Sequence, residues 1–182
     1  MSGRPYVFLD RDGTLIHDPG YIHRVEDYRL LDGVVDGLRA LRAAGFGLAI
    51  VTNQSGIGRG YFSEAAFHAL QQHLLEDLQG RGIAIDRSYF CPHAPGDTCR
   101  CRKPGTELLE RAQRELGAEL AASWVIGDAP SDMELAQRAG CRGVWVGRAG
   151  AAPAGVPEAA GVREAAALIT AAPAARARSG TE

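Results

Sequence analysis

Short apolar runs alternate with amphipathic stretches along most of the chain. The apolar runs predict buried strands at 6–9, 46–51, 89–90, 124–126 and 143–146. The stretches between them carry helical spacing or helix-start signals, at 33–44, 63–79, 105–116 and 131–139. This alternation predicts right-handed crossovers and an α/β fold, with a Rossmann-like central parallel sheet flanked by helices.

Polar side chains come directly after several of the predicted strands. Asp10 and Asp12 follow the first strand, Thr52 and Asn53 the second, and Asp128 the fourth. Ligands of such folds bind beyond the carboxyl ends of the strands. We therefore expect these residues to meet at one edge of the sheet.

The composition changes from Ala149 onward, where fourteen of the last 34 residues are alanine. We predict a main domain over residues 1–150 and an alanine-rich C-terminal segment over 151–182. Within that segment, 162–170 is expected to form one short helix. The part beyond Pro173 is expected to be a frayed tail.

Length and charge exclude several classes of protein. The chain has 182 residues, enough for one domain with a substantial core. Its 20 basic and 22 acidic residues give a net charge of −2, which argues against nucleic-acid or membrane partners. The longest strongly apolar run, 46–51, is too short to span a membrane, and the N-terminus has no signal-type stretch. We expect a cytoplasmic monomer.

The segment Asp10-Arg11-Asp12-Gly13-Thr14 carries the strongest chemical signal. Two carboxylates at a strand end can converge on one Mg²⁺, with Asp128 as a third oxygen ligand. One Asp could attack a phosphate to form an aspartyl phosphate, while the other protonates the leaving oxygen and later activates water. A surface turn rich in Asp and Gly is the alternative interpretation of this segment alone.

Three further segments suit phosphate chemistry. Hydroxyl and amide groups in 52–56 could bind phosphate oxygens. Lys103 could neutralise charge in the transition state, and Asp132 could hold that lysine or orient the ligand set. Ser131 is expected to cap the helix that follows.

Taken in order, the DxDGT, TN, RKP and GDxxSD segments resemble the haloacid dehalogenase (HAD) superfamily of phosphatases, over Tyr6 to Val146. The resemblance implies that Asp10 is the nucleophile and Asp12 the general acid/base. It also implies that Thr52 and Lys103 stabilise the phosphoryl group. Mg²⁺ would bind to Asp10, to Asp128 and to the backbone carbonyl of Asp12.

A second group of residues predicts a structural zinc site. Cys91, His93, Cys99 and Cys101 supply three thiolates and one imidazole within eleven residues. Since all four ligands come from the protein, this zinc-binding loop at 91–101 is expected to position Arg102 and Lys103 rather than do chemistry. Cys141 lies outside the group and is expected to be a small buried thiol.

Within the superfamily, the segments 10–16, 20–21 and 52–62 resemble the heptose bisphosphate phosphatases. That resemblance implies a sugar phosphate substrate contacted by Arg11, Asp18, Pro19, Gly20, Tyr21, Asn53, Gln54, Ser55 and Arg102. Two features depart from it. Only five residues separate His93 from Cys99, so this short loop resembles the histidinol-phosphate phosphatases as much as the longer-looped heptose enzymes. Ala129 stands where many heptose enzymes have lysine.

The spacing of the motifs leaves no room for a separate cap domain. There are 31 residues between Thr14 and Phe46, and 49 between Asn53 and Lys103. Loops must then select the substrate. The alternatives to a heptose bisphosphate phosphatase are a histidinol-phosphate phosphatase, a polynucleotide 3′-phosphatase and a noncatalytic zinc-stabilised binding module.

Overall fold

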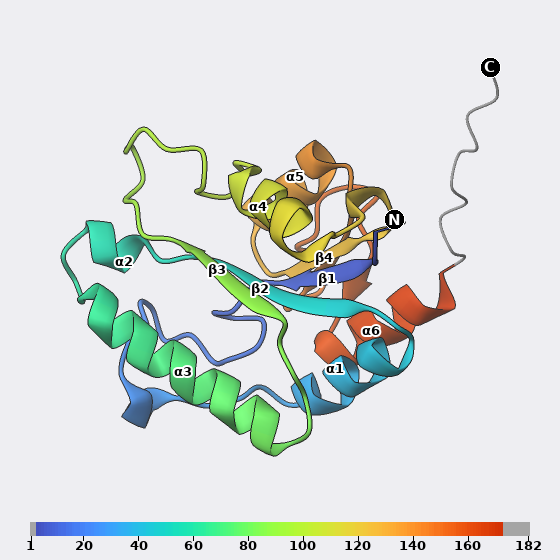
Figure 1. The fold of residues 1–182 in the computed structure, drawn as a ribbon, viewed down its shortest axis with the longest axis horizontal. Coiled ribbons are helices and arrows are strands. Elements are labelled where there is room, and N and C mark those ends of the chain that lie inside the picture. The colour runs from blue at the N-terminus through green and yellow to red at the C-terminus, as the bar shows by residue number, and fades with distance from the viewer. Residues whose placement is uncertain (1–2, 173–182) are drawn as a thin grey trace.

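A computed structural model describes residues 3–172 and has a six-stranded, all-parallel sheet at its centre (Figure 1). The strand order is β3-β2-β1-β4-β5-β6. The strands are β1 (Tyr6–Leu9), β2 (Gly47–Asn53), β3 (Arg87–Cys91), β4 (Trp124–Gly127), β5 (Arg142–Val146) and β6 (Glu158–Ala159). The prediction of a parallel α/β sheet is confirmed.

Helices cover both faces of this sheet. They are α1 (Val34–Ala43), the one-turn α2 (Ser55–Gly58), α3 (Glu64–Gly80), α4 (Glu107–Leu116), α5 (Pro130–Ala139) and α6 (Val162–Ala171). Two 3-10 turns, η1 (Val25–Asp27) and η2 (Leu120–Ala122), complete the elements. Figure 1 shows α1, α3 and α6 on one face and α4 and α5 on the other.

The two faces have separate hydrophobic cores because successive strand residues point in opposite directions. In β1, Val7 and Leu9 pack with apolar side chains of α1, α3 and α6. Tyr6 and Phe8 pack with those of α4 and α5 on the other face. Burial on both sides explains why the strands are continuous apolar runs.

The predicted ranges of α1, α3, α4, α5 and α6 agree with the structure to within two residues, but one of the predicted helix caps is wrong. The Ser63 hydroxyl accepts a hydrogen bond from the Ala66 amide at the start of α3 (3.1 Å), as expected of a helix cap. The prediction that Ser131 caps α5 is wrong, because α5 begins at Pro130 and its cap is Ala129. Asp132 accepts from the Ala129 amide instead (3.1 Å).

The C-terminal segment belongs to the same structural unit as the rest of the chain. The predicted helix at 162–170 is present as α6, but β6 also joins the sheet beside β5. Helix α6 lies against α1, where a Cβ on Gly37 would come within 2.5 Å of the Val162 carbonyl oxygen. A boundary at residue 150 therefore does not divide the fold, and the predicted tail beyond Pro173 lies outside the described residues.

No helix within 3–172 is long and apolar enough to cross a membrane.

Candidate active site

Three carboxylates meet at the carboxyl ends of β1 and β4. The backbone pairing sets Leu9 beside Ile126, and the Asp10 amide donates to the Ile126 carbonyl oxygen (2.9 Å). Asp10 and Asp128 follow these strands directly, and Asp132 lies in the first turn of α5. One oxygen from each of the three carboxylates lies within 4.8 Å of the others. The expected convergence of Asp10 and Asp128 is present.

Lys103 crosses from the loop after β3 into this cluster. Its Nζ atom lies 2.7 Å from Asp10 Oδ1, 2.6 Å from Asp132 Oδ1 and 2.9 Å from the Val51 carbonyl oxygen. Burial alone would lower the pKa of Lys103, but the two carboxylates raise it above the usual value, so the amine is charged. Lys103 is also the only lysine in the chain. The prediction that Asp132 holds Lys103 is confirmed.

The cluster has more negative charge than one lysine can balance. Burial raises the pKa of Asp10, and Lys103 opposes that effect. Burial, together with the neighbouring Asp10 and Asp132, raises the pKa of Asp128 to about 7. Asp132 is paired with Lys103, and the crowded carboxylate oxygens of Asp10 and Asp128 are hard ligands of the kind that Mg²⁺ prefers. The residues therefore suit the metal that the sequence predicted.

Gly13 allows the loop after β1 to close against Asp128. Its φ is +81°, in the left-handed region that favours glycine. A Cβ atom there would lie 2.1 Å from Asp128 Oδ2. Any side chain at position 13 would displace the carboxylate from the cluster.

The Asp12 carboxylate, predicted to converge on the same ion, is not part of this group, in which Asp132 is the third carboxylate, and it has its own partners. Arg11 donates to it through Nε (2.6 Å, to Oδ1) and Nη2 (3.1 Å, to Oδ2). Gln54 donates from Nε2 to Asp12 Oδ2 (2.9 Å) and to the Thr52 hydroxyl (2.9 Å). The hydrogen bond from Gln54 to Asp12 thus connects the loop after β2 to the loop after β1.

Arg11 and Asn53, predicted to contact substrate, are engaged within the protein. Arg11 is fully buried, which does not agree with direct substrate contact. Both ends of the Asn53 amide bind the backbone of Lys103: Oδ1 accepts from its N–H (2.9 Å) and Nδ2 donates to its carbonyl oxygen (3.2 Å). Asn53 therefore fixes the lysine loop to the end of β2.

Four further predicted substrate residues lie on the loop between β1 and η1. Asp18 accepts from the Gly20 amide (2.8 Å) in a turn that also includes Pro19. Tyr21 follows with φ +55°, unusual for a residue with a side chain, and packs edge-on against Tyr61 at 4.8 Å between ring centroids.

Two predicted substrate residues lie on the segments that follow β2 and β3. Ser55 opens α2 directly after Gln54. Arg102 precedes Lys103, and its Nη1 lies 3.5 Å from the His93 carbonyl oxygen.

The four predicted zinc ligands come together in the loop after β3. His93 Nδ1 lies 3.4 Å from Cys91 Sγ and 3.2 Å from Cys101 Sγ. Cys91 Sγ lies 3.0 Å from Cys101 Sγ and 3.9 Å from Cys99 Sγ. The four ligand atoms lie within 4.8 Å of one another, and three thiolates with one imidazole are a donor set of the kind that binds structural zinc. None of the four cysteines forms a disulfide, and Cys141 is buried as expected.

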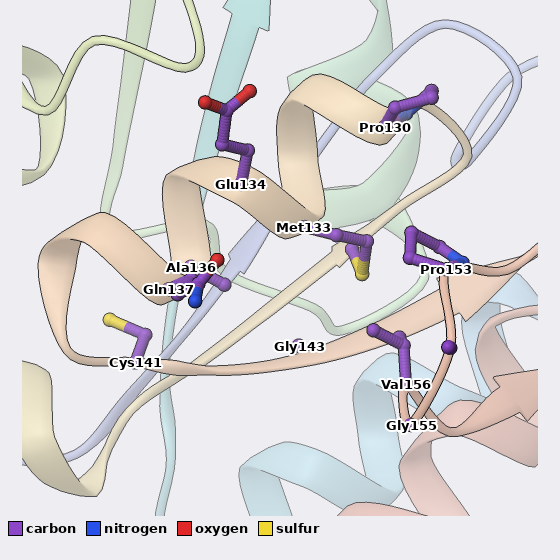
Figure 2. A pocket seen from close by; sticks show the side chains of 11 residues that line it. Pro130, Met133, Glu134, Ala136, Gln137, Cys141, Gly143, Pro153, Gly155 and Val156 are labelled. Atoms are coloured by element: carbon purple, nitrogen blue, oxygen red, sulfur yellow. The ribbon is translucent and has the colours of Figure 1, made fainter.

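A cavity of about 420 Å³ lies away from these groups, between α5, the start of β5 and the loop at 153–156 (Figure 2). Met133, Glu134 and Cys141 contribute to its lining. None of the predicted site residues lines it. A second cavity, of about 350 Å³, adjoins the acidic cluster through Gly13 and Thr14.

Sequence reasoning missed Gln71 and Tyr61. Gln71 lies on the buried side of α3, is 5% exposed, and contacts Arg11. The signal was a glutamine within the apolar stripe formed by Phe67, Leu70, Leu74 and Leu78. Tyr61 gave no local signal, because its partner Tyr21 lies on another loop.

Comparisons with known proteins identify the family of this chain. The family model described as HAD-hydrolase-like matches residues 100–168. D-glycero-beta-D-manno-heptose-1,7-bisphosphate 7-phosphatase of Yersinia pestis is 45% identical over 139 residues, which cover 72% of this chain and 74% of that protein. The enzyme of the same name from Escherichia coli K12 is 42% identical over 72% of this chain and 73% of its own length. The chain belongs to the HAD phosphatases.

Solved structures of HAD phosphatases share the whole fold. The D,D-heptose 1,7-bisphosphate phosphatase from B. bronchiseptica, complexed with magnesium and phosphate, superposes with a TM-score of 0.82. It is 28% identical, over 91% of this chain and 97% of that one. A HAD-like phosphatase from Mesorhizobium loti has a TM-score of 0.83 and is 30% identical, over 94% and 86% of the two chains. The shared architecture includes the parallel sheet whose carboxyl edge carries the acidic cluster of this HAD phosphatase.

Proposed function

We propose that this HAD phosphatase removes the 7-phosphate of D-glycero-β-D-manno-heptose 1,7-bisphosphate and leaves heptose 1-phosphate. The observation that carries the reaction is the buried Asp10–Lys103–Asp132 cluster, joined by Asp128 at the carboxyl ends of β1 and β4. The substrate rests on the names of relatives that are 42% and 45% identical. The enzyme would act on this sugar phosphate as a cytoplasmic monomer, without nucleic-acid or membrane partners.

In the first step, an Asp10 carboxylate oxygen forms a bond to phosphorus while the bond from phosphorus to the sugar oxygen breaks. Asp12 gives its proton to that leaving oxygen. In the second step, Asp12 takes a proton from water, which attacks the aspartyl phosphate and releases inorganic phosphate. Mg²⁺, bound by Asp10, Asp128 and the backbone carbonyl of Asp12, would supply positive charge to the phosphoryl oxygens.

Lys103 and Thr52 act on the phosphoryl group itself. The Lys103 amine, 2.7 Å from Asp10 Oδ1, stands where negative charge develops as the phosphoryl group is transferred. The Thr52 hydroxyl accepts from Gln54 and can direct its own proton toward a phosphate oxygen. Both side chains are buried, so their electrostatic effect is only weakly screened by water.

Zinc in the Cys91–His93–Cys99–Cys101 site would hold Lys103 in place. Cys101 is two residues before Lys103, and the loop also contacts α2, where the Gly58 amide donates to the Pro92 carbonyl oxygen (2.9 Å). The metal therefore links the lysine loop to the segment after β2.

Removing zinc is expected to lower kcat about tenfold or more and to reduce the melting temperature, because the loop that positions Lys103 loses its cross-link. Zinc content and kcat would be measured together on the Cys99→Ser variant and on chelated wild type. Cys141→Ser, a buried thiol outside the cluster, is the matched control. Unchanged kcat in protein shown to be free of zinc would contradict this role.

The substrate assignment is tested by comparing kcat/KM for heptose 1,7-bisphosphate and histidinol phosphate, with magnesium present. We expect the heptose compound to be preferred by about a hundredfold, some 2.7 kcal/mol of transition-state discrimination. The reverse preference would mean that the five-residue spacing between His93 and Cys99 decides the substrate.

A further inference from the structure

Arg11 is a charged side chain with no exposed surface. A buried guanidinium is tolerated only when its donors are satisfied, because unpaired charge in the interior is costly. Nε and Nη2 are bound by Asp12, and Nη2 also lies 3.4 Å from the Ile22 carbonyl oxygen. Nη1 lies 3.4 Å from Gln71 Oε1. The guanidinium also lies over the Phe67 ring, 5.2 Å from its centroid.

Gln71 continues this chain of contacts into the body of the protein. Its Oε1 faces Arg11, and its Nε2 donates to the Ser88 hydroxyl on β3 (3.0 Å). A buried amide in the apolar stripe of α3 is expensive unless both of its ends are bound, as they are here. Ser88, which is partly exposed, and the buried Gln71 and Arg11 thus form a series that ends on the Asp12 carboxylate.

A general acid works only when its proton points at the leaving atom, and small displacements reduce the rate strongly. Asp12 can rotate about its side-chain bonds, and its carboxylate is held from one side by Arg11 and from the other by Gln54. The Arg11 contact is bidentate, which fixes the plane of the carboxylate as well as its position.

We propose that Arg11 and Gln71 are positioning residues for the general acid/base, which they hold through the series Ser88–Gln71–Arg11–Asp12. This inference rests on the proposed function in one respect, the assignment of Asp12 as the acid. It gives Arg11 a role in the chemical step in place of substrate contact. It also makes α3 and β3, which carry Gln71 and Ser88, part of the catalytic framework.

The test uses two substrates that differ in their need for an acid. The alkoxide leaving from heptose 1,7-bisphosphate needs a proton, whereas the nitrophenolate leaving from p-nitrophenyl phosphate does not. Because kcat/KM reports the first irreversible step, it reports leaving-group departure. For Arg11→Met we expect a loss of about a hundredfold in kcat/KM on the heptose compound and less than about fivefold on p-nitrophenyl phosphate. For Gln71→Met we expect the same pattern, at about tenfold and less than about twofold.

Two variants provide the controls. Gln72→Met alters the neighbouring glutamine of α3, which is exposed and bonds only Glu76 among the described contacts, so both substrates should be turned over as in wild type. Arg11→Lys keeps the charge but not the bidentate geometry, and is expected to lie between wild type and Arg11→Met on the heptose compound.

Equal losses on both substrates in Arg11→Met and Gln71→Met would overturn the proposal, because a general loss of structure affects both leaving groups alike. Asp12→Asn separates this failure from that of the proposed function. If Asp12→Asn keeps its kcat/KM on p-nitrophenyl phosphate while Arg11→Met and Gln71→Met lose theirs, Asp12 is the acid and the proposed positioning series is wrong. If Asp12→Asn also loses both equally, the acid assignment fails and the series fails with it. If the wild-type enzyme is inactive on heptose 1,7-bisphosphate, the substrate proposal is wrong. The comparison of variants would then use histidinol phosphate.

Discussion

Asp10→Asn is expected to abolish turnover while leaving the protein folded. The amide cannot form the acyl phosphate, so the reaction loses its covalent route. The fold should persist because Lys103 keeps Asp132, 2.6 Å away, as an ionic partner. The substitution also removes a buried charge whose pKa burial has already raised. We expect kcat below about 1% of wild type, with an unchanged circular dichroism spectrum.

The covalent intermediate gives a second readout of the same change. Wild type mixed with labelled substrate and quenched in acid should retain label on the protein, and Asp10→Asn should not. Asp36→Asn, an exposed carboxylate on α1 that pairs with Arg163, is the matched control and should behave as wild type in both assays. Residual turnover above about 1%, or label retained on the Asp10→Asn variant, would remove Asp10 from the nucleophile role.

The positions of Asp10 and Asp128 could be predicted because each depends on local signals combined with one topological rule. Each follows a short apolar run that can be recognised as a buried strand, and the carboxyl ends of parallel strands share one edge. The zinc ligands could be predicted equally well from the sequence, because all four lie within eleven residues. In both cases the chemistry is encoded by residue type and short spacing.

The partners of Arg11 and Asn53 could not be predicted, because both residues bind groups that are far away in the sequence. Asn53 bonds a backbone 50 residues away, and Arg11 meets Gln71 at a separation of 60 residues. Such contacts are decided by how α3 and the lysine loop pack on the sheet. Docking of α6 on α1 depends likewise on the close approach at Gly37, which composition alone does not reveal. For this reason the sequence alone places the alanine-rich segment 151–182 outside the main domain.

Lys103→Met is expected to have the largest combined effect on activity and stability. It removes the only positive side chain that contacts the cluster and leaves Asp10, Asp128 and Asp132 without an ionic partner among the described residues. Breaking a buried ion pair in this way costs about 3–5 kcal/mol of unfolding free energy. We expect kcat to fall about a thousandfold, since charge developing on the phosphoryl group loses its fixed counter-charge. Urea unfolding and steady-state kinetics measure the two effects. Arg138→Met, which breaks an exposed pair with Glu134, is the control and should change unfolding free energy by less than about 1 kcal/mol.

The pH dependence of that loss distinguishes an electrostatic cause from a packing defect. Asp128 already has a pKa of about 7 in the folded protein, raised by burial and by Asp10 and Asp132, and without Lys103 the carboxylates should bind protons more readily still. A carboxyl group whose pKa is higher in the folded state than in the unfolded state stabilises the fold at low pH, and that contribution is lost as pH rises through the folded pKa. Metal-free Lys103→Met should therefore recover unfolding free energy, relative to wild type, as pH is lowered from about 8 to about 5. Magnesium should restore part of the same loss at pH 8, because a cation in the cluster replaces the missing charge. A deficit independent of both pH and magnesium would mean that Lys103 stabilises the protein through packing alone, and its role in neutralising phosphoryl charge would then lack support.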